Sequence, residues 1–302
     1  MSSKIPFLDL LKKRTVLFDG AMGTTLITQG LAAGESPEGW NLSHGDVVSE
    51  VHRAYVEAGA DVLQTNTLGG TRMKLMASGL ADQAEEVNIQ AVRLARQVSP
   101  AHCYVAGDIG PTGQFLAPVG TSTPEEMEKS FREQAEILAD EGVDLFVVET
   151  MYDLREIALA VRAVRAISDQ PIVATVTFER KPKGFFTLMG NSVADCAQEL
   201  AAAGADVVGS NCGFGSADMA DLAPLWRERT DLPILIQPNR GQPEIKSGSL
   251  TYQQKPEAFA EDIMKIVKAG ADAVGGCCGT TPEFIALIHQ RLSTAGFLKA
   301  KE

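Results

Sequence analysis

The sequence predicts an α/β protein, a single-domain (β/α)8 TIM barrel over residues 1–302. Short apolar runs alternate along the chain with amphipathic helical segments, and this alternation is typical of a parallel sheet. In addition, the phrase Gly-Ala-Asp or Gly-Val-Asp precedes an apolar run four times. Its glycines (Gly59, Gly142, Gly204 and Gly270) lie 83, 62 and 66 residues apart, which fits two strand–helix units per interval and eight units in all.

Each repeat is interpreted as a helix that ends at its glycine, a two-residue turn and a short strand. The strands are expected at residues 16–19, 62–66, 104–108, 145–149, 171–178, 207–212, 232–237 and 273–278. Helices are expected at about 82–97, 154–167 and 217–228, and the segments 180–184 and 241–254 are expected to be loops. An open doubly wound sheet is the competing fold, but no Gly-x-Gly-x-x-Gly follows the first strand.

The composition argues against several classes of partner. Of the 302 residues, 27 are Lys or Arg and 39 are Asp or Glu, which gives a net charge of −12. This charge disfavours nucleic acid and anionic membranes, because both require a positive protein surface. The longest apolar runs fall far short of the ~18 residues of a membrane span, and the N-terminus lacks the apolar core of a secretory signal. We therefore expect a cytoplasmic protein whose five cysteines are thiols or metal ligands rather than disulfides.

In a barrel of this type the site lies at the carboxyl ends of the strands. Cys212 is expected at the end of the sixth strand, and Cys277 and Cys278 at the end of the eighth. Three thiols that converge in a reducing compartment favour a soft metal, and zinc suits thiolate ligands without redox chemistry. Because three protein ligands leave one position open, the pattern indicates a catalytic zinc site rather than a structural one.

Adjacent side chains of a regular strand point to opposite faces, so Cys277 and Cys278 can share a metal only where the strand ends or kinks. The flanking glycines, Gly275, Gly276 and Gly279, permit that distortion. The competing interpretation is that these cysteines are small buried hydrophobic residues, or that the adjacent pair forms a disulfide when oxidised.

The remaining cysteines and the histidines are expected to lie outside the site. Cys103 precedes the third strand, at the opposite end of the barrel, and Cys196 falls on a helix. The histidines fall on helices or loops away from the strand ends, and we expect them at the surface: His44, His52, His102 and His289.

Three thiolates around a dipositive ion leave one net negative charge. Such a site does little to polarise a carbonyl group or to acidify water. It suits a substrate thiol, since the metal lowers the pKa of the thiol while the electron-rich ligands leave the sulfur nucleophilic. The ligand set therefore favours alkylation of a thiol.

Four segments resemble signature segments of the homocysteine S-methyltransferases: Asp19–Thr24 (DGAMGT), Gln64–Thr67 (QTNT), Gly209–Gly213 (GSNCG) and Gly275–Pro282 (GGCCGTTP). The resemblance runs from about residue 8 to 293, essentially the whole chain. Within this family the chain is most similar to the homocysteine-binding module of cobalamin-dependent methionine synthase. The segments Gly107–Gly113 (GDIGPTG) and Cys277–Pro282 favour that branch.

The resemblance implies an enzyme of methionine biosynthesis that activates homocysteine as a zinc thiolate on Cys212, Cys277 and Cys278. The thiolate would attack the methyl group of methylcobalamin, giving methionine and cob(I)alamin. No folate-binding, cobalamin-binding or reactivation module follows residue 302. The chain is therefore expected to be either an excised module or a stand-alone enzyme, and the methyl donor to be carried by a partner corrinoid protein or module rather than bound tightly here.

The resemblance also points to Asp19 and Glu149 as partners of the homocysteine ammonium. The alternative for Asp19 is a turn or helix-cap residue, and for Glu149 an ion pair in the barrel core. We expect the substrate carboxylate to meet backbone N–H groups of the Ala21–Thr24 turn at a helix N-terminus. Asn66, Asn211, Asn239 and Asp108 are expected to orient ligands through hydrogen bonds, the alternative being simple loop structure. The candidate substrate-site residues are Asp19, Gly20, Ala21, Met22, Gly23, Thr24, Asn66, Asp108, Glu149, Asn211 and Asn239.

Several alternatives keep the fold and the zinc site. The methyl donor could be S-methylmethionine, although that branch carries an arginine where Gly279 stands, or betaine, which needs an aromatic cage. Only Tyr152 lies near a strand end, and Leu68 stands where the family often has phenylalanine. Another thiol could be the acceptor. A non-catalytic zinc-binding barrel would need a fourth protein ligand, yet no further cysteine or histidine falls at a strand end.

Overall fold

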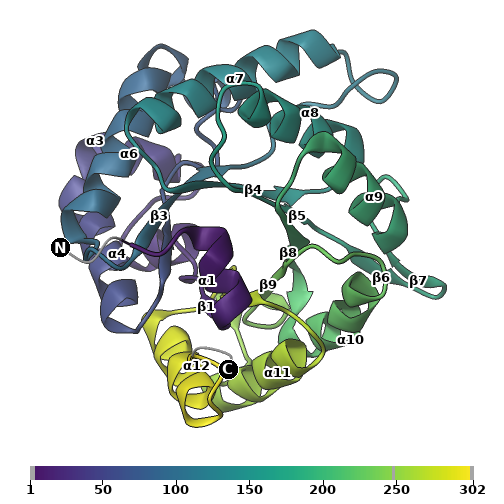
Figure 1. Cartoon of the computed structure of the whole chain (residues 1–302). Coiled ribbons are helices and arrows are strands. Elements are labelled where there is room, and N and C mark those ends of the chain that lie inside the picture. The colour runs from purple at the N-terminus through teal and green to yellow at the C-terminus, as the bar shows by residue number, and fades with distance from the viewer. Residues whose placement is uncertain (1–3, 247–248, 300–302) are drawn as a thin grey trace.

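A computed structural model of the chain describes residues 4–246 and 249–299. Its centre is an eight-stranded parallel sheet with the strand order β1-β12-β9-β8-β5-β4-β3-β2. The outermost strands meet through a parallel bridge between Phe18 and Val62, and the Asp19 N–H donates to the Val62 carbonyl (3.1 Å). The sheet thus closes into a barrel inside a ring of helices (Figure 1), which confirms the predicted (β/α)8 fold.

All eight predicted strands are present, although their ends differ from the predicted bounds. They are β1 (Val16–Leu17), β2 (Val62–Gln64), β3 (Tyr104–Ile109), β4 (Leu145–Met151), β5 (Ile172–Val176), β8 (Val207–Gly215), β9 (Ile234–Asn239) and β12 (Ala273–Val274). The outer ring contains α4 (Gly45–Glu57), α6 (Ala84–Val98), α7 (Pro124–Asp140), α8 (Leu154–Arg165), α9 (Val193–Ala203), α10 (Ser216–Arg227), α11 (Pro256–Lys268) and α12 (Pro282–Thr294). Shorter helices, α2 (Gly23–Thr28), α3 (Trp40–Ser43) and α5 (Arg72–Leu75), lie in the first two strand-to-helix connections.

The four repeat glycines each follow a helix, as predicted. Their φ angles are 94°, 77°, 104° and 108° at Gly59, Gly142, Gly204 and Gly270. Gly204 is the left-handed C-cap of α9. Because residues with a Cβ atom rarely adopt this conformation, glycine at these points ends the helix and turns the chain into the next strand.

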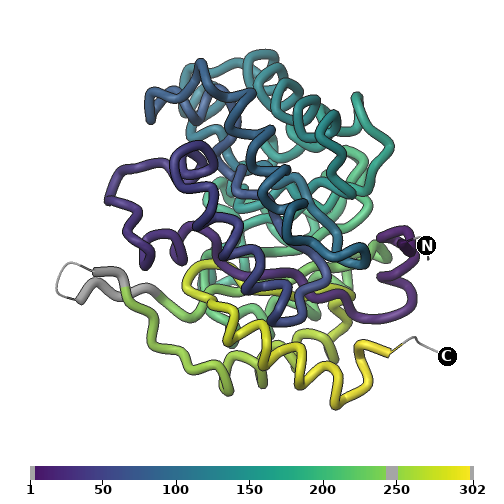
Figure 2. The backbone as a smooth tube through the Cα atoms, turned by 90° about the vertical axis from the view of Figure 1, so that its left-hand side faces the viewer, coloured from purple at the N-terminus to yellow at the C-terminus, as the bar shows by residue number. Residues whose placement is uncertain are grey.

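Helix α1 (Phe7–Lys13) closes the end of the barrel at which the strands begin. Its buried residues Phe7, Leu10 and Leu11 belong to one apolar cluster with inward-facing strand residues such as Val147 and Leu235. Figure 1 looks onto this end, with α1 across the centre, and Figure 2 shows the connection after β1 at the other end of the molecule. The site must therefore open at the end where the strands finish.

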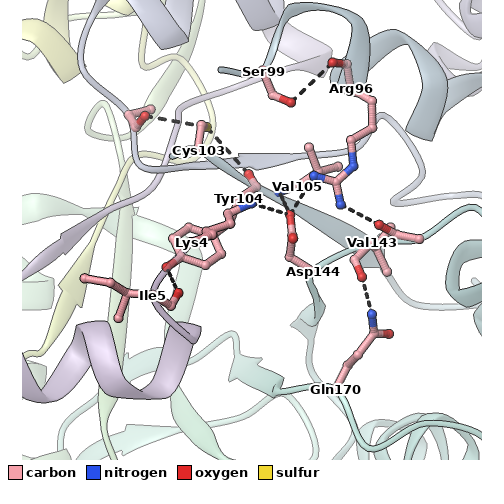
Figure 3. A network of polar contacts seen from close by, with 12 residues as sticks. Lys4, Ile5, Arg96, Ser99, Cys103, Tyr104, Val105, Val143, Asp144 and Gln170 are labelled. Carbon is pink, nitrogen blue, oxygen red and sulfur yellow. Dashed lines mark hydrogen bonds and ion pairs between the residues drawn. The ribbon is translucent and has the colours of Figure 1, made fainter. Parts of the chain in front are cut away.

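Polar contacts hold together the closed end (Figure 3). The Asp144 carboxylate accepts hydrogen bonds from Lys4 Nζ (2.9 Å) and the Val105 N–H (2.7 Å), and pairs with Arg96 Nη1 (2.8 Å). Cys103 lies in this region and donates towards the Ala60 carbonyl (3.8 Å). Its predicted position far from the other thiols is therefore confirmed. In barrels, polar networks at this end serve stability rather than chemistry.

Two segments predicted as loops contain antiparallel hairpins. After β5, the strands β6 (Glu179–Lys181) and β7 (Gly184–Phe186) pair, and after β9 the strands β10 (Pro243–Lys246) and β11 (Ser249–Tyr252) pair. The first hairpin docks on α10, because Arg180 pairs with Asp218 (2.9 Å). The Arg180 guanidinium also lies over the Phe185 ring within the same hairpin (4.9 Å). Positions 247 and 248 of the second predicted loop lie outside the described residues.

The prediction that all four histidines lie at the surface is wrong for His52. Its side chain is 0% exposed, since it falls on the buried stripe of α4 with Val48, Val51 and Tyr55. Neither ring nitrogen has a hydrogen-bond partner among residues 4–246 and 249–299, and burial lowers the pKa of His52 to about 4. His44 and His102 are exposed, and His289 is half-buried. Among the described residues, every helix is too short or too polar to span a lipid bilayer.

Candidate metal and substrate site

The three predicted thiols meet at the open end of the barrel. The sulfur atoms of Cys212, Cys277 and Cys278 all lie within 4.8 Å of one another, and the Sγ atoms of Cys212 and Cys278 are 3.9 Å apart. Strand β12 ends at Val274, so the chain is free of strand geometry where the adjacent pair stands. A Cβ atom on Gly276 would lie 2.3 Å from Thr280 Oγ1, which makes glycine necessary at that point of the turn.

The three adjacent thiols cannot all be deprotonated at once, because their negative charges would repel one another. Hydrogen bonds from the thiols of Cys277 and Cys278 lower the pKa of Cys212 to about 3, and the Asn239 side chain contributes in the same direction. Conversely, the Cys212 thiolate raises the pKa of Cys278 to about 12 and that of Cys277 well above its ordinary value. A dipositive ion in the middle would remove this conflict, because it stabilises all three thiolates. The donor set therefore fits a soft metal ion such as zinc.

A cavity of about 170 Å³ runs from these thiols to the open end of the barrel. Eleven of the predicted site residues line it: Gly20, Ala21, Met22, Gly23, Thr24, Asn66, Asp108, Glu149, Cys212, Cys277 and Cys278. Asp19 lies behind this wall, 3% exposed, and its carboxylate accepts from the Gln64 N–H (2.9 Å). Asn211 and Asn239 are also buried outside the lining, next to sulfur atoms rather than next to the cavity.

Three buried carboxyl groups surround the inner part of the cavity. Burial, together with the charge of Glu149, raises the pKa of both Asp19 and Asp108 well above the ordinary value. Burial also raises the pKa of Glu149 to about 7, and the charge on Cys212 adds to this shift. The Oδ1 atoms of Asp19 and Asp108 have no hydrogen-bond partner among the described residues. Buried carboxylates without partners call for a cation, and an ammonium group would supply charge and N–H donors together.

The turn before α2 offers backbone donors to an anion. The Ala21 N–H already donates to Thr280 Oγ1 (3.2 Å). Within the described part of the chain, the N–H groups of Met22, Gly23 and Thr24 make no hydrogen bond. Of the predicted Ala21–Thr24 donors, the last three are therefore free for a carboxylate.

Asn66 is committed to the protein rather than to the cavity. Its Nδ2 donates to the Pro37 carbonyl (2.7 Å) and to Asn41 Oδ1 (2.9 Å), and the Asn41 amide donates back to the Asn66 carbonyl (2.9 Å). This reciprocal pair fixes the connection after β1 over the strand end of β2. Asn66 thus shapes the cavity wall.

Five polar residues that line the cavity were not predicted: Glu38, Gln64, Thr65, Thr150 and Gln237. Glu38 lines the cavity and accepts from the Gly69 N–H (2.7 Å). Gln64, which also lines it, accepts from Gln237 Nε2 (2.7 Å) and hydrogen-bonds Glu149. The two glutamines could have been noticed, because each stands next to or at a strand end. Nothing in the local sequence places Glu38, since it lies in a long connection.

The fold and the site together define a barrel enzyme with a thiol-rich centre and an acidic cavity. A family model described as homocysteine S-methyltransferase matches residues 16–292. The chain therefore belongs to the homocysteine S-methyltransferase family.

Two curated relatives carry the name methionine synthase. The protein of Mycobacterium leprae (strain TN) is 31% identical over 296 residues, which cover 92% of this chain and 24% of that protein. The protein of Mycobacterium tuberculosis (strain ATCC 25618 / H37Rv) is 32% identical, with the same coverage of 92% and 24%. The chain thus spans about a quarter of the length of these relatives.

Solved structures of the homocysteine methyltransferase MmuM from Escherichia coli are similar over nearly the whole chain. The metallated form matches with a TM-score of 0.80 at 26% identity, covering 95% of this chain and 100% of that one. The oxidized form matches with a TM-score of 0.78 at 27% identity, covering 95% and 98%.

Proposed function

We propose that this chain is a zinc-dependent homocysteine S-methyltransferase that converts homocysteine to methionine. The observation that carries the proposal is the convergence of Cys212, Cys277 and Cys278 within 4.8 Å at one end of the cavity. Acidic groups for an ammonium and free N–H groups for a carboxylate line the same cavity. The site therefore offers a partner for each functional group of a thiol-bearing α-amino acid: its thiol, its ammonium and its carboxylate.

Cys212, Cys277 and Cys278 would hold the zinc ion. When bound, zinc supplies the positive charge that lets a substrate thiol lose its proton at neutral pH. The Oδ1 of Asn239 is buried without a hydrogen-bond partner in the described part of the chain, and its side chain lies beside Cys212. It is thus available as a weak fourth ligand in the absence of substrate.

The chain's own residues hold the amino-acid part of the substrate. In this proposal the Glu149 carboxylate, which lines the cavity, binds the ammonium, and Asp19 supports it from behind the cavity wall with its buried carboxyl group. The N–H groups of Met22 to Thr24 bind the carboxylate. This two-point attachment directs the substrate sulfur towards the three thiols and away from bulk water, so the reacting atom is held before the donor arrives.

We further propose methylcobalamin, carried by a corrinoid protein or module in the cytoplasm, as the methyl donor. The similarity to methionine synthases of mycobacteria supports this choice. The cavity of about 170 Å³ is too small for a corrinoid, so the donor would present its methyl group from outside. The substrate sulfur attacks the methyl carbon, a carbon–sulfur bond forms, and the electron pair of the broken cobalt–carbon bond stays on the corrinoid as cob(I)alamin.

The test combines zinc analysis with methionine formation from homocysteine. Methylcobalamin, betaine and S-methylmethionine are compared as donors, and we expect methylcobalamin to give the fastest turnover. Cys277→Ala should lose most of its zinc and activity. Cys196→Ala is the matched control, since Cys196 is a buried thiol of α9 outside the site, and it should keep both. Full zinc occupancy in Cys277→Ala would refute the ligand assignment, and faster turnover with betaine or S-methylmethionine would refute the donor.

A further inference from the structure

The loop that would bind the amino acid and the loop that carries two of the thiols touch along their length. The Gly276 N–H donates to the Asp19 carbonyl (2.9 Å), and the Gly279 N–H donates to Thr24 Oγ1 (3.0 Å). These contacts bracket residues 20–24 on one side and Cys277 and Cys278 on the other. The two loops therefore form one hydrogen-bonded unit.

Thr280 lies at the centre of this unit and is 0% exposed. Its hydroxyl donates to the Cys277 carbonyl (2.7 Å) and accepts from the Ala21 N–H (3.2 Å). A hydroxyl has one hydrogen, so the two bonds run in a fixed direction, from Ala21 through Thr280 to Cys277. Displacement of either loop would break a buried hydrogen bond that water cannot replace.

The surrounding residues hold the Thr280 hydroxyl in place. A Cβ atom on Gly20 would lie 2.8 Å from Thr280 Oγ1, and one on Gly276 would lie 2.3 Å from it. The hydroxyl therefore packs directly against the backbone of both loops. From α4, the buried Tyr55 hydroxyl reaches the carbonyls of Ala21 (2.9 Å) and Thr280 (3.1 Å), so it ties the same two loops to the outer helix.

We propose that Thr280 is a positioning residue that couples residues 20–24 to Cys277 and Cys278, so that amino-acid binding and metal retention strengthen each other. The inference rests on the proposed function for the identity of the two ligands. A ligand bound to residues 20–24 restricts the motion of Ala21. Through the two hydrogen bonds of Thr280 this also restricts Cys277, so Cys277 and Cys278 release the metal more slowly. By thermodynamic reciprocity, the metal favours amino-acid binding to the same degree.

The experiment separates this coupling from direct contact between substrate sulfur and metal. L-Norvaline carries a methyl group where homocysteine carries its thiol, so it can occupy the amino-acid site without becoming a ligand. The transfer rate of zinc from the full chain to a chromogenic chelator is measured with and without saturating L-norvaline. For the wild type we expect L-norvaline to slow zinc loss roughly fivefold or more, within the range of ordinary coupling.

Thr280→Val keeps the shape of the side chain and removes the hydroxyl. We expect L-norvaline to slow its zinc loss less than about twofold, because the link from Ala21 is lost. Basal zinc loss should be roughly tenfold faster, because the Cys277 carbonyl loses its buried donor. Thr280→Ser restores the hydroxyl and should restore the wild-type response. Thr187→Val is the matched control, since Thr187 is a buried threonine in the connection after β5, hydrogen-bonded to Asn191 Oδ1 (3.2 Å).

The outcomes distinguish the two proposals. If wild-type protein binds no zinc, or binds neither L-norvaline nor homocysteine, the proposed function is overturned. If it binds homocysteine but not L-norvaline, amino-acid binding depends on the sulfur ligand and the coupling role is overturned. If both bind but L-norvaline leaves zinc loss unchanged, or Thr280→Val responds like wild type, the coupling role of Thr280 is overturned. Tyr55→Phe serves as a second variant should Thr280→Val fail to fold. It removes a bridge between the same loops, and a wild-type response in it would also count against the coupling.

Discussion

The side-chain amide of Asn211 points at the sulfur of Cys277, with Nδ2 3.9 Å from Sγ. The same amide donates to Thr150 Oγ1 (2.7 Å) and accepts from the Thr150 N–H (2.8 Å) and from Thr175 Oγ1 (2.9 Å). Thr150 and Cys212 both have positive φ angles, 60° and 58°, which are rare for residues with side chains. Asn211 therefore holds the strained backbone beside Glu149 and Cys212 while its amide also contacts the thiol of Cys277.

Asn211→Asp tests this arrangement, because it keeps the shape and places a carboxyl group where the amide N–H meets sulfur. Repulsion between a carboxylate and thiolates should weaken zinc binding, by roughly 10–100-fold as for other outer-shell partners of metal ligands. Competition with a chelator of known affinity measures the effect. Thr175→Val is the control, since it removes a donor to Asn211 Oδ1 and leaves the contact with sulfur. Equal zinc affinity in Asn211→Asp and wild type would contradict the role.

Homocysteine should change the sulfur environment of the bound zinc. X-ray absorption is expected to show three sulfur neighbours of zinc in the substrate-free protein and four after homocysteine is added. A proton should be released at pH 7, because free thiols with a pKa of ~8.5 are mostly protonated there. Methionine has no thiol proton and should bind more weakly. If zinc has three sulfur neighbours both before and after homocysteine is added, and no proton is released, the thiol-activation mechanism is wrong, whereas the zinc ligands remain as assigned.

Glu149→Gln should weaken amino-acid binding without loss of zinc. A charge-assisted hydrogen bond to the ammonium would be lost, so we expect roughly 10–100-fold lower affinity for L-norvaline by calorimetry. The raised pKa of Glu149, about 7, also sets a pH dependence. Below pH 7 the group is protonated, so wild-type affinity should rise between pH 6 and 8, whereas this step should be absent from the variant. If the affinity of wild type and of Glu149→Gln depended on pH in the same way, Glu149 would not bind the ammonium.

His52 should make the fold less stable in mild acid. The unfolded chain takes up a proton near pH 6.5, whereas the buried ring stays neutral down to its pKa of about 4. Stability is thus complete above pH 6.5 and falls by about 3 kcal/mol as the pH drops towards 4. Urea unfolding at several pH values should show this loss in wild type and in the exposed control His102→Leu. A profile for His52→Leu as steep as that of wild type would contradict the assignment.

The cysteine site could be predicted because its parts are local. Each ligand is predicted at a strand end, and the repeat spacing alone brings the ends of the sixth and eighth strands to one rim. The glycines around Cys277 and Cys278 permit an end or a kink at the pair, although the predicted strand reaches residue 278 and β12 already ends at Val274. The positions of Asp108 and Glu149 follow from the same rule, since both end strands that face the cavity.

The residues that support the ligands could not be predicted in this way. Tyr55 reaches Thr280 from a helix 225 positions earlier in the chain, and Gln64 meets Gln237 across 173 positions. Such pairs depend on the register of the closed barrel, which the hydrophobic pattern does not specify. The surface prediction for His52 rests on its place on a helix away from the strand ends, although its spacing from Val48 and Tyr55 places it on the buried face of α4. Helical periodicity is therefore a better guide to burial than distance from the strand ends.

Helix α1 has a consequence for the order of events. Phe7, Leu10 and Leu11 close one end of the barrel, so the proposed substrate and the methyl donor would share the opposite opening. In the proposed reaction homocysteine would lie deeper than a donor that stays outside a cavity of about 170 Å³, so it would have to enter first. Methionine can leave only after the demethylated donor has withdrawn. Steady-state kinetics should accordingly follow a compulsory order, and the residence time of the spent donor on the barrel would limit the turnover rate.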